Sequence, residues 1–307
     1  MIGAMYENGG NTTHRFLDGH PGLYVYPFES QLGTRHVVDP LTSMFPAKYR
    51  WPVFPLAASP ADDFESIIDE ETRVRARTPH VSKFRDTPFD FDDGERKRLY
   101  LDDVGHDARS RAGNVAAFFR ATFDAWHDHR SSGEETFYVG YSPIVTVDAE
   151  LILTELPEAQ FLHVVRNPWS AYADTKKRPV PLSLPSYLLG WTTCQHFALS
   201  VARRFESRFH LLRLEDLLED PEAALAPICR AIGVGPDSAL QAPSWNGSPL
   251  DEIYPWGTIR HATPEANRET AAELTAAEAD EVASRVHEYL APLGYEDFVR
   301  QVEFTPA

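Results

Sequence analysis

An abrupt change from apolar to polar sequence within residues 161–178 constrains the fold more than any other stretch of the chain. Residues 161–165 form a short apolar run, which is typical of a strand buried on both faces of a parallel sheet. Pro168 cannot extend a strand interior, and Ser170 is a suitable N-cap for a following helix. Arg166 therefore stands at the carboxyl end of a strand, where open α/β sheets bind ligands. A surface ion pair is the alternative role for this arginine.

The acidic balance of the chain makes its basic clusters informative. Of 307 residues, 29 are Lys or Arg and 46 are Asp or Glu, which gives a formal charge of −17. This charge argues against nucleic acid or an anionic membrane surface as a partner. An anionic ligand must then be held by locally concentrated cations, and the Lys-Lys-Arg cluster at 176–178 follows Arg166 by about two to three helical turns.

Other features of the sequence indicate in which cellular compartment the protein resides. No apolar run approaches the length that spans a membrane, and the amino-terminal residues lack the basic region of a signal peptide. Cys194 and Cys229 both lie in apolar, helix-like patterns, so we expect reduced core residues. Together these features predict a cytoplasmic protein.

Strand-like and helix-like segments alternate over 1–38 and again from residue 136. This alternation predicts one α/β domain over 1–307, with a central parallel sheet flanked by helices. Residues 40–135 interrupt it with prolines, turn formers and an acidic run. Their one predicted helix spans about 112–127, where apolar side chains recur at helical spacing and are expected to pack in the core. We expect 40–135 to be an insertion or cap that shapes a binding pocket.

A glycine-rich turn lies between a predicted strand at 1–6 and a predicted helix. Backbone N–H groups in such a turn and the positive end of the helix attract phosphate, and hydroxyl groups add hydrogen bonds. The turn lacks the Gly-Lys-Ser/Thr ending of a nucleoside triphosphatase loop, and an ordinary turn is the alternative. The candidate phosphate-binding residues are Gly9, Gly10, Asn11, Thr12 and Thr13.

Four segments follow one another in an order that resembles the sulfotransferase family. They are the loop with Thr12-Thr13, then Asp18-Gly19-His20-Pro21 before a strand that leads to Glu29, then Phe161-Leu162-His163-Val164-Val165-Arg166-Asn167-Pro168, and finally Glu215-Asp216-Leu217 with Asp220-Pro221-Glu222. The resemblance covers roughly 1–38 and 136–300. It implies a P-loop nucleotide-hydrolase-like α/β fold and transfer of a sulfuryl group from 3′-phosphoadenosine-5′-phosphosulfate, without a metal. The acceptor is expected to be a small or medium-sized molecule with a hydroxyl group or, less readily, an amine, and 40–135 would shape its pocket.

The resemblance also implies which residues hold the donor. The glycine-rich loop with His14 would bind the 5′-phosphosulfate. Arg166 would bind the 3′-phosphate, with Ser170 or Thr175 as hydroxyl partners. A late loop would close the site through Trp256, Gly257 and Arg260, with Trp256 either stacked on adenine or packing the loop onto the body.

Two residues compete for the role of general base. Glu29 follows the second predicted strand at about the place where some family members have a catalytic carboxylate. His20 is the alternative, since its ordinary pKa suits proton transfer near neutrality, although Gly-His-Pro is also a turn motif. The sequence favours Glu29 and leaves His20 open.

The chain departs from the family pattern in three places, one of which is a helix from Thr13 to Asp18 that is shorter than usual. The loop carries Glu7, Asn8, Gly9 and Gly10 where the family has a lysine or arginine, so His14 or Arg15 would have to substitute. Asp174 stands where the family has a serine after the arginine, and a carboxylate there would repel a 3′-phosphate. The last two departures favour an alternative function, binding of a nucleotide or another anion without sulfuryl transfer. A kinase is a third reading, but the chain offers no Gly-Lys-Ser/Thr to hold a triphosphate.

Overall fold

The structure is a computed structural model of the chain, and it describes residues 1–105, 109–250 and 263–304. Its centre is a parallel sheet with the strand order β4-β1-β5-β6. The strands are β1 (Ile2–Ala4), β4 (Tyr141–Pro143), β5 (Phe161–Val165) and β6 (Phe209–Arg213). All five residues of β5 are buried, as its continuous apolar sequence predicts.

A second pair of parallel strands extends this sheet. It consists of β2 (Leu23–Val25) and β3 (Phe137–Val139), and only Gly140 separates β3 from β4. The backbone N–H of Tyr26 donates to Val139 O at 2.9 Å, and that of Ser30 donates to Tyr141 O at 2.6 Å. The segment after β2 therefore runs along the edge of the sheet beside both strands.

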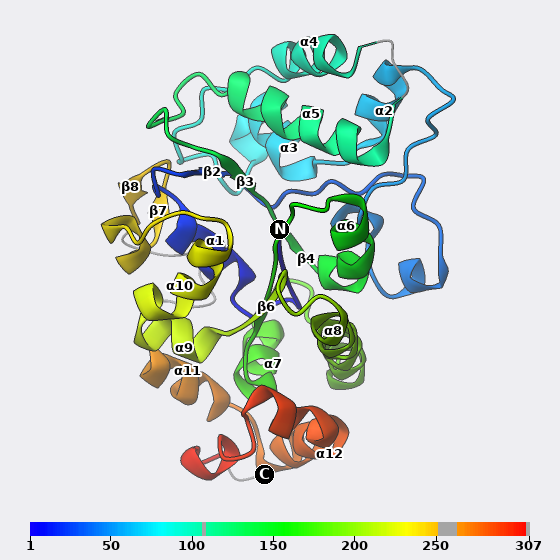
Figure 1. Cartoon of the computed structure of the whole chain (residues 1–307). Coiled ribbons are helices and arrows are strands. Elements are labelled where there is room, and N and C mark those ends of the chain that lie inside the picture. The colour runs from blue at the N-terminus through cyan, green and yellow to red at the C-terminus, as the bar shows by residue number, and fades with distance from the viewer. Residues whose placement is uncertain (106–108, 251–262, 305–307) are drawn as a thin grey trace.

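Helices cover both faces of the sheet (Figure 1). One face carries α1 (Gly10–Leu17), α9 (Leu214–Glu219) and α10 (Pro221–Ala231), and the other carries α6 (Ala149–Glu155) and α8 (Leu184–Arg204). This arrangement confirms the predicted α/β fold class.

Three further helices lie together beyond the end of the sheet where β5 leads into α7 (Figure 1). They are α7 (Pro168–Lys176), α11 (Pro264–Ala271) and α12 (Ala276–Leu293). The N-cap of α7 is Asn167, whose side chain accepts a hydrogen bond from Ser170 N at 2.8 Å, so the prediction of Ser170 as the cap is wrong. Pro168 occupies the first helical position, which leaves the residue before it to cap the helix.

Within 40–135, the helices between residues 60 and 124 form the group at the top of Figure 1. The predicted helix at 112–127 is confirmed as α5 (Arg111–Asp124), but the prediction missed α2 (Pro60–Ser66), α3 (Glu70–Arg77) and α4 (Asp93–Val104). These three helices are rich in charged residues and show little apolar periodicity. The remaining short elements are η1 (Pro40–Ser43), η2 (Ala47–Tyr49), η3 (Pro79–Val81), η4 (Val145–Asp148), η5 (Ser238–Gln241), β7 (Ser244–Trp245), β8 (Ser248–Pro249) and η6 (Val299–Gln301).

A buried arginine in α4 connects this helix with the start of α3 and with the segment that follows β2. Arg96 is fully buried and pairs with Asp69 at 2.5 Å and with Asp93 at 2.5 Å. Its Nη1 also lies 3.4 Å from the hydroxyl of Tyr26, which follows β2. The backbone N–H of Asp69 donates to Gln31 O at 2.9 Å. The start of α3 is thereby fixed beside the segment that follows β2.

Both cysteines are buried and unpaired, which confirms their predicted reduced state. Across the described part of the chain, every helix falls short of the length and apolar character needed to cross a bilayer.

Candidate functional site

The loop between β1 and α1 takes its shape from two buried side chains. Asn8 accepts hydrogen bonds at Oδ1 from Arg166 N at 3.0 Å and from Trp191 Nε1 at 3.1 Å, and its Nδ2 donates to Tyr6 O at 2.8 Å. Nη1 of Arg166 donates to Glu7 O at 3.2 Å. These bonds hold Glu7 at a φ of 60°, a conformation that a residue with a side chain seldom adopts.

The amino-terminal turn of α1 is tightly packed. Gly9 has a φ of 86°, and a Cβ on Gly10 would lie 2.2 Å from the ring of Tyr141. The hydroxyl of Thr13 donates to Gly9 O at 3.0 Å, and the side chains of Thr12 and Thr13 are buried. Asn11, one of the five predicted loop residues, lines a small cavity.

Of the two predicted substitutes for the missing loop cation, Arg15 lines a small cavity together with Asn11, and His14 is fully buried. Burial and the Arg15 guanidinium hold the pKa of His14 well below its ordinary value, so the ring is neutral near pH 7. Nη2 of Arg15 lies 2.8 Å from Nδ1 of His14 and donates to Tyr26 O at 3.0 Å. The Arg15 guanidinium also lies over the Trp245 ring, 5.1 Å from its centroid.

Arg178 is a further cation beside the loop. Its Nε lies 3.8 Å from Glu7 Oε1, and its guanidinium lies 4.7 Å from the centroid of the Tyr6 ring. The side chain is 32% exposed, so it remains within reach of a ligand. The two lysines before it pair elsewhere, Lys176 with Glu278 at 2.7 Å and Lys177 with Asp174 at 3.1 Å.

Glu29 meets a second carboxylate that the sequence did not single out. The backbone N–H of Glu29 donates to Glu71 Oε2 at 3.3 Å, and Gln31 Nε2 donates to Glu29 Oε2 at 3.3 Å. The other oxygen of Glu71 pairs with Lys83. Glu71 and Lys83 belong to 40–135, and their spacing carries no signal of a shared site. The small cavity they share is lined by Asn11, Arg15, Pro27, Phe28, Glu29, Glu71, Lys83, Phe84, Thr87, Trp245 and Leu250.

The charges in this cavity act on one another. Burial and the Glu29 carboxylate raise the pKa of Glu71 to about 7, against the opposing effect of Lys83. Burial alone would lower the pKa of Lys83, but Glu71 and Glu29 raise it above its ordinary value. Burial raises the pKa of Tyr6, while Arg178 lowers it and Glu29 raises it. Glu29 and Arg178 therefore both act on the same tyrosine.

His20 lies at the other end of α1, and its ring is fully engaged with backbone. Nδ1 accepts a hydrogen bond from Gly22 N at 3.0 Å, which leaves Nε2 to donate to Gly235 O at 2.9 Å. These two bonds fix a neutral tautomer with no ring nitrogen left for a substrate proton. This arrangement is that of a structural turn residue.

The residues predicted to hold a 3′-phosphate make internal contacts. Nη1 of Arg166 pairs with Asp174 Oδ2 at 2.6 Å, Ser170 Oγ donates to Asn267 O at 2.6 Å, and Thr175 Oγ1 donates to Ala171 O at 3.0 Å. The predicted late-loop residues Trp256, Gly257 and Arg260 lie outside the described residues.

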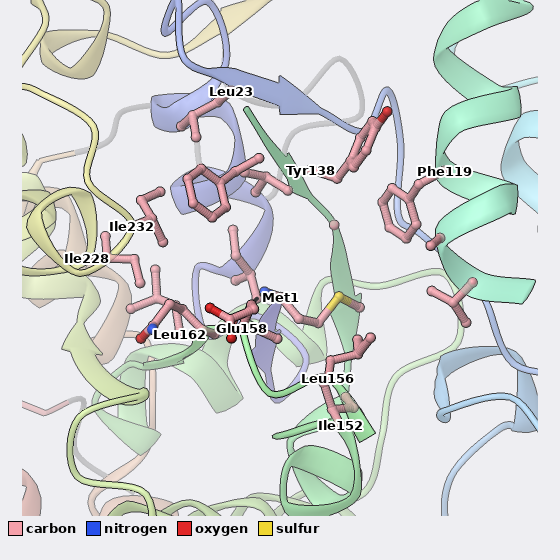
Figure 2. Close-up of a pocket in the computed structure, with 18 of the residues that line it drawn as sticks. Met1, Leu23, Phe119, Tyr138, Ile152, Leu156, Glu158, Leu162, Ile228 and Ile232 are labelled. Atoms are coloured by element: carbon pink, nitrogen blue, oxygen red, sulfur yellow. Dashed lines mark hydrogen bonds between the residues drawn. The ribbon is translucent and has the colours of Figure 1, made fainter. Parts of the chain in front are cut away.

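A larger apolar cavity of ≈ 400 Å³ lies at the opposite end of the strands. Figure 2 shows Met1 at its centre, with Leu162, Ile228 and Ile232 on one side and Phe119, Ile152 and Leu156 on the other. Its lining includes the first residues of β1 and β3, whereas the loop, Arg166 and Arg178 belong to the carboxyl end of the sheet. This cavity is therefore separate from the candidate site.

No group of three or more His, Cys, Asp or Glu side chains within residues 1–105, 109–250 and 263–304 is arranged to hold a metal ion.

Comparison with known proteins places the chain in a family. The model of the sulfotransferase family matches residues 11–237. Similar solved structures include the sulfotransferase domain from the Synechococcus PCC 7002 olefin synthase, at 17% identity, 93% coverage of both chains and a TM-score of 0.46. The sulfotransferase domain from the curacin biosynthetic pathway has 13% identity, coverage of 93% of this chain and 96% of that chain, and a TM-score of 0.45. Sulfotransferase STF9 from Mycobacterium avium has 14% identity, coverage of 100% and 78%, and a TM-score of 0.46.

No curated protein matches the chain. Because the family model spans well over half of the 307 residues, the chain belongs to the sulfotransferase family.

Proposed function

We propose that the chain transfers a sulfuryl group from a nucleoside 5′-phosphosulfate to a hydroxyl group, or less readily an amine, of a small or medium-sized acceptor. The family resemblance makes 3′-phosphoadenosine-5′-phosphosulfate the first donor to consider. The observation that carries the proposal is that the carboxylate Glu29 lines a cavity together with Asn11 of α1, while the guanidinium Arg178 lies against the loop before α1. Proton removal and charge stabilisation thus have candidate groups in one place.

The phosphosulfate end of a donor suits the start of α1. The helix end favours negative charge, and Arg178 lies against the same loop at Glu7 and Tyr6. In the reaction, the bond between the acceptor oxygen and sulfur forms while the bond between sulfur and the phosphate oxygen breaks. The leaving phosphate gains negative charge, which Arg178 and the helix end would stabilise.

Glu29 is the proposed general base, and it takes the proton of the acceptor hydroxyl. Two neighbouring carboxyl groups do not ionise equally, because the first charge disfavours the second. Burial and the Glu29 carboxylate raise the pKa of Glu71 to about 7.

Aromatic side chains line the acceptor side of the proposed site. The rings of Phe28 and Phe84 lie 4.3 Å apart, and those of Phe28 and Trp245 lie 5.1 Å apart. All three line the cavity that contains Glu29. An acceptor with an apolar or aromatic body next to its hydroxyl group would suit this lining.

The proposal is tested by measuring sulfated product from a panel of phenolic and alcoholic acceptors. The donors are 3′-phosphoadenosine-5′-phosphosulfate and, in parallel, adenosine 5′-phosphosulfate. Glu29→Gln should lower kcat by about 10²–10⁴-fold with little change in KM, because it removes only the base. Glu70→Gln makes the same charge change at an exposed position paired with Lys48 and should retain turnover. Full activity in Glu29→Gln would refute the assignment of the base.

A second function is favoured by the absence of a lysine or arginine within the loop itself. In this alternative, the sulfotransferase fold binds a nucleotide or another anion without sulfuryl transfer. Calorimetric binding of adenosine nucleotides together with no sulfated product from any acceptor and either donor would support it.

A further inference from the structure

A carboxylate of the protein occupies the place that the family resemblance assigns to a 3′-phosphate. Asp174 stands eight residues after Arg166, where the resemblance leads us to expect a serine. Its Oδ2 lies 2.6 Å from Nη1 of Arg166, and the two side chains are 0% and 1% exposed. Arg166 thus already has an anionic partner in a buried setting, and a phosphate would have to displace it.

The remaining contacts of Arg166 also go to protein atoms. Its Nε donates to Asn267 Oδ1 in α11 at 2.5 Å, and its Nη1 donates to Glu7 O at 3.2 Å as well as to Asp174. Asn267 in turn donates from Nδ2 to Glu215 Oε1 at 2.9 Å. The guanidinium therefore links the loop, α7 and α11.

The hydroxyl groups that could replace the missing serine also donate hydrogen bonds to protein atoms. Ser170 Oγ donates to the backbone oxygen of Asn267 at 2.6 Å, and Thr175 Oγ1 donates to that of Ala171 at 3.0 Å. Both side chains are buried. Neither hydroxyl proton is available to a phosphate oxygen while these bonds persist.

Among the residues that the structure describes, the local charge gives a phosphate no advantage. Lys177 Nζ lies 3.1 Å from Asp174 Oδ1 and 2.8 Å from Glu273 Oε1, so the cations Arg166 and Lys177 face two carboxylates. A phosphate monoester would add about 1.5 to 2 negative charges to this balanced group. In dinucleotide-binding folds, a carboxylate accompanies a free ribose hydroxyl and an arginine accompanies its phosphorylated form. Here the arginine is present but a carboxylate neutralises it.

We infer that the chain uses a donor whose ribose carries a free 3′-hydroxyl, and that Asp174 selects this donor against the 3′-phosphorylated one. The inference rests on the proposed function, because it names the donor class for the same reaction. Adenosine 5′-phosphosulfate is the simplest donor of that class. The start of α1 and Arg178 serve the 5′ end of either donor, so the difference lies in the surroundings of Arg166.

The unmodified protein provides the first test, by calorimetry with the two desulfated products. Adenosine 5′-monophosphate should bind at least as tightly as adenosine 3′,5′-bisphosphate. A bisphosphate that binds more than about tenfold more tightly would overturn the inference and leave the proposed function standing. If folded protein binds neither nucleotide at high micromolar concentration, the proposed function itself fails, and the inference fails with it.

Substitution of the carboxylate provides the second test. Asp174→Asn keeps the size of the side chain, and Asp174→Ser restores the residue type of the family. Each should tighten binding of the bisphosphate by about tenfold or more while binding of the monophosphate stays nearly unchanged. A ratio of the two affinities that stays at the wild-type value in folded variants would overturn the inference.

Glu273→Gln is the matched control. It removes one negative charge beside the same lysine, Lys177, without a contact to Arg166. It should leave the ratio of the two affinities at the wild-type value. An equal gain in this variant would mean that general charge, rather than Asp174, sets the preference. Thermal unfolding of each variant shows whether it is folded, and the comparison of nucleotides on the unmodified protein is independent of that result.

Discussion

Replacement of Glu71 by glutamine tests the electrostatic account of the site through protein stability, without any substrate. Glu71 is buried against Glu29 and Lys83, and its pKa is raised from 4.5 to about 7. Between these pH values the folded protein binds more protons than the unfolded chain. The free energy of unfolding must therefore fall as the pH rises through this range.

The magnitude follows from the two pKa values. At 1.36 kcal/mol per pKa unit, the difference between 4.5 and about 7 corresponds to about 3 kcal/mol, most of which falls between pH 5 and pH 8. Glu71→Gln cannot titrate, so it should lack this loss. In the wild type, Lys83 keeps its charge across the range because its pKa is raised.

Urea denaturation of both proteins at pH 5, 6, 7 and 8 measures the effect. The stability of the wild type should fall relative to Glu71→Gln by about 2–3 kcal/mol across the series. Glu70→Gln changes the neighbouring, exposed carboxylate and should follow the wild type. Parallel curves for the wild type and Glu71→Gln, or a wild type that gains stability relative to the variant, would refute the reasoning.

Two further predictions concern packing. Arg96→Met should lower the free energy of unfolding by about 3–5 kcal/mol, since it leaves the buried carboxylate of Asp69 without its cation and Asp93 with only Arg77. Arg98→Met, at a side chain that is 60% exposed, should have a far smaller effect. Urea denaturation at pH 7 measures the free energy of unfolding of both variants, and equal values would contradict the prediction. Gly10→Ala should lose about 1–3 kcal/mol because its Cβ would lie 2.2 Å from the Tyr141 ring, and Gly235→Ala, which meets nothing within 4 Å, is the control. A Gly10→Ala protein that melts at the wild-type temperature would show that the loop has room to shift.

The parts of the fold that local sequence determines could be predicted. The apolar run of β5 is a strand because its side chains are buried on both faces, and the aromatic stripe of α5 packs in the core as its spacing indicates. The cap of α7 was misassigned by three residues, because Pro168 shifts the start of the helix toward the strand. The charged helices α3 and α4 depend on contacts such as the buried pairs of Arg96, and these leave no periodic trace in the sequence.

The candidate site was predictable only where one segment supplied it. Glu29 and the loop before α1 follow from strand ends, but the partner of Glu29 comes from 42 residues further along the chain. The bond from Arg166 to Asn267 spans 101 residues. Contacts of this kind are set by how helices pack over the end of the sheet. A list of plausible residues therefore follows from the sequence, whereas their partners do not.

The attachment of α3 beside β2 affects how chimeras of related enzymes can be designed. The segment from Asp69 to Phe84 contains Glu71, whose pKa is raised, its partner Lys83, and Phe84, which lines the cavity proposed to take the acceptor. Under the proposed function, grafting this segment onto another scaffold would transfer acceptor preference and acid–base behaviour as one unit. A chimera built to alter selectivity alone would also change its pH profile, and it would need Arg96 as well, because Arg96 is the buried partner of Asp69.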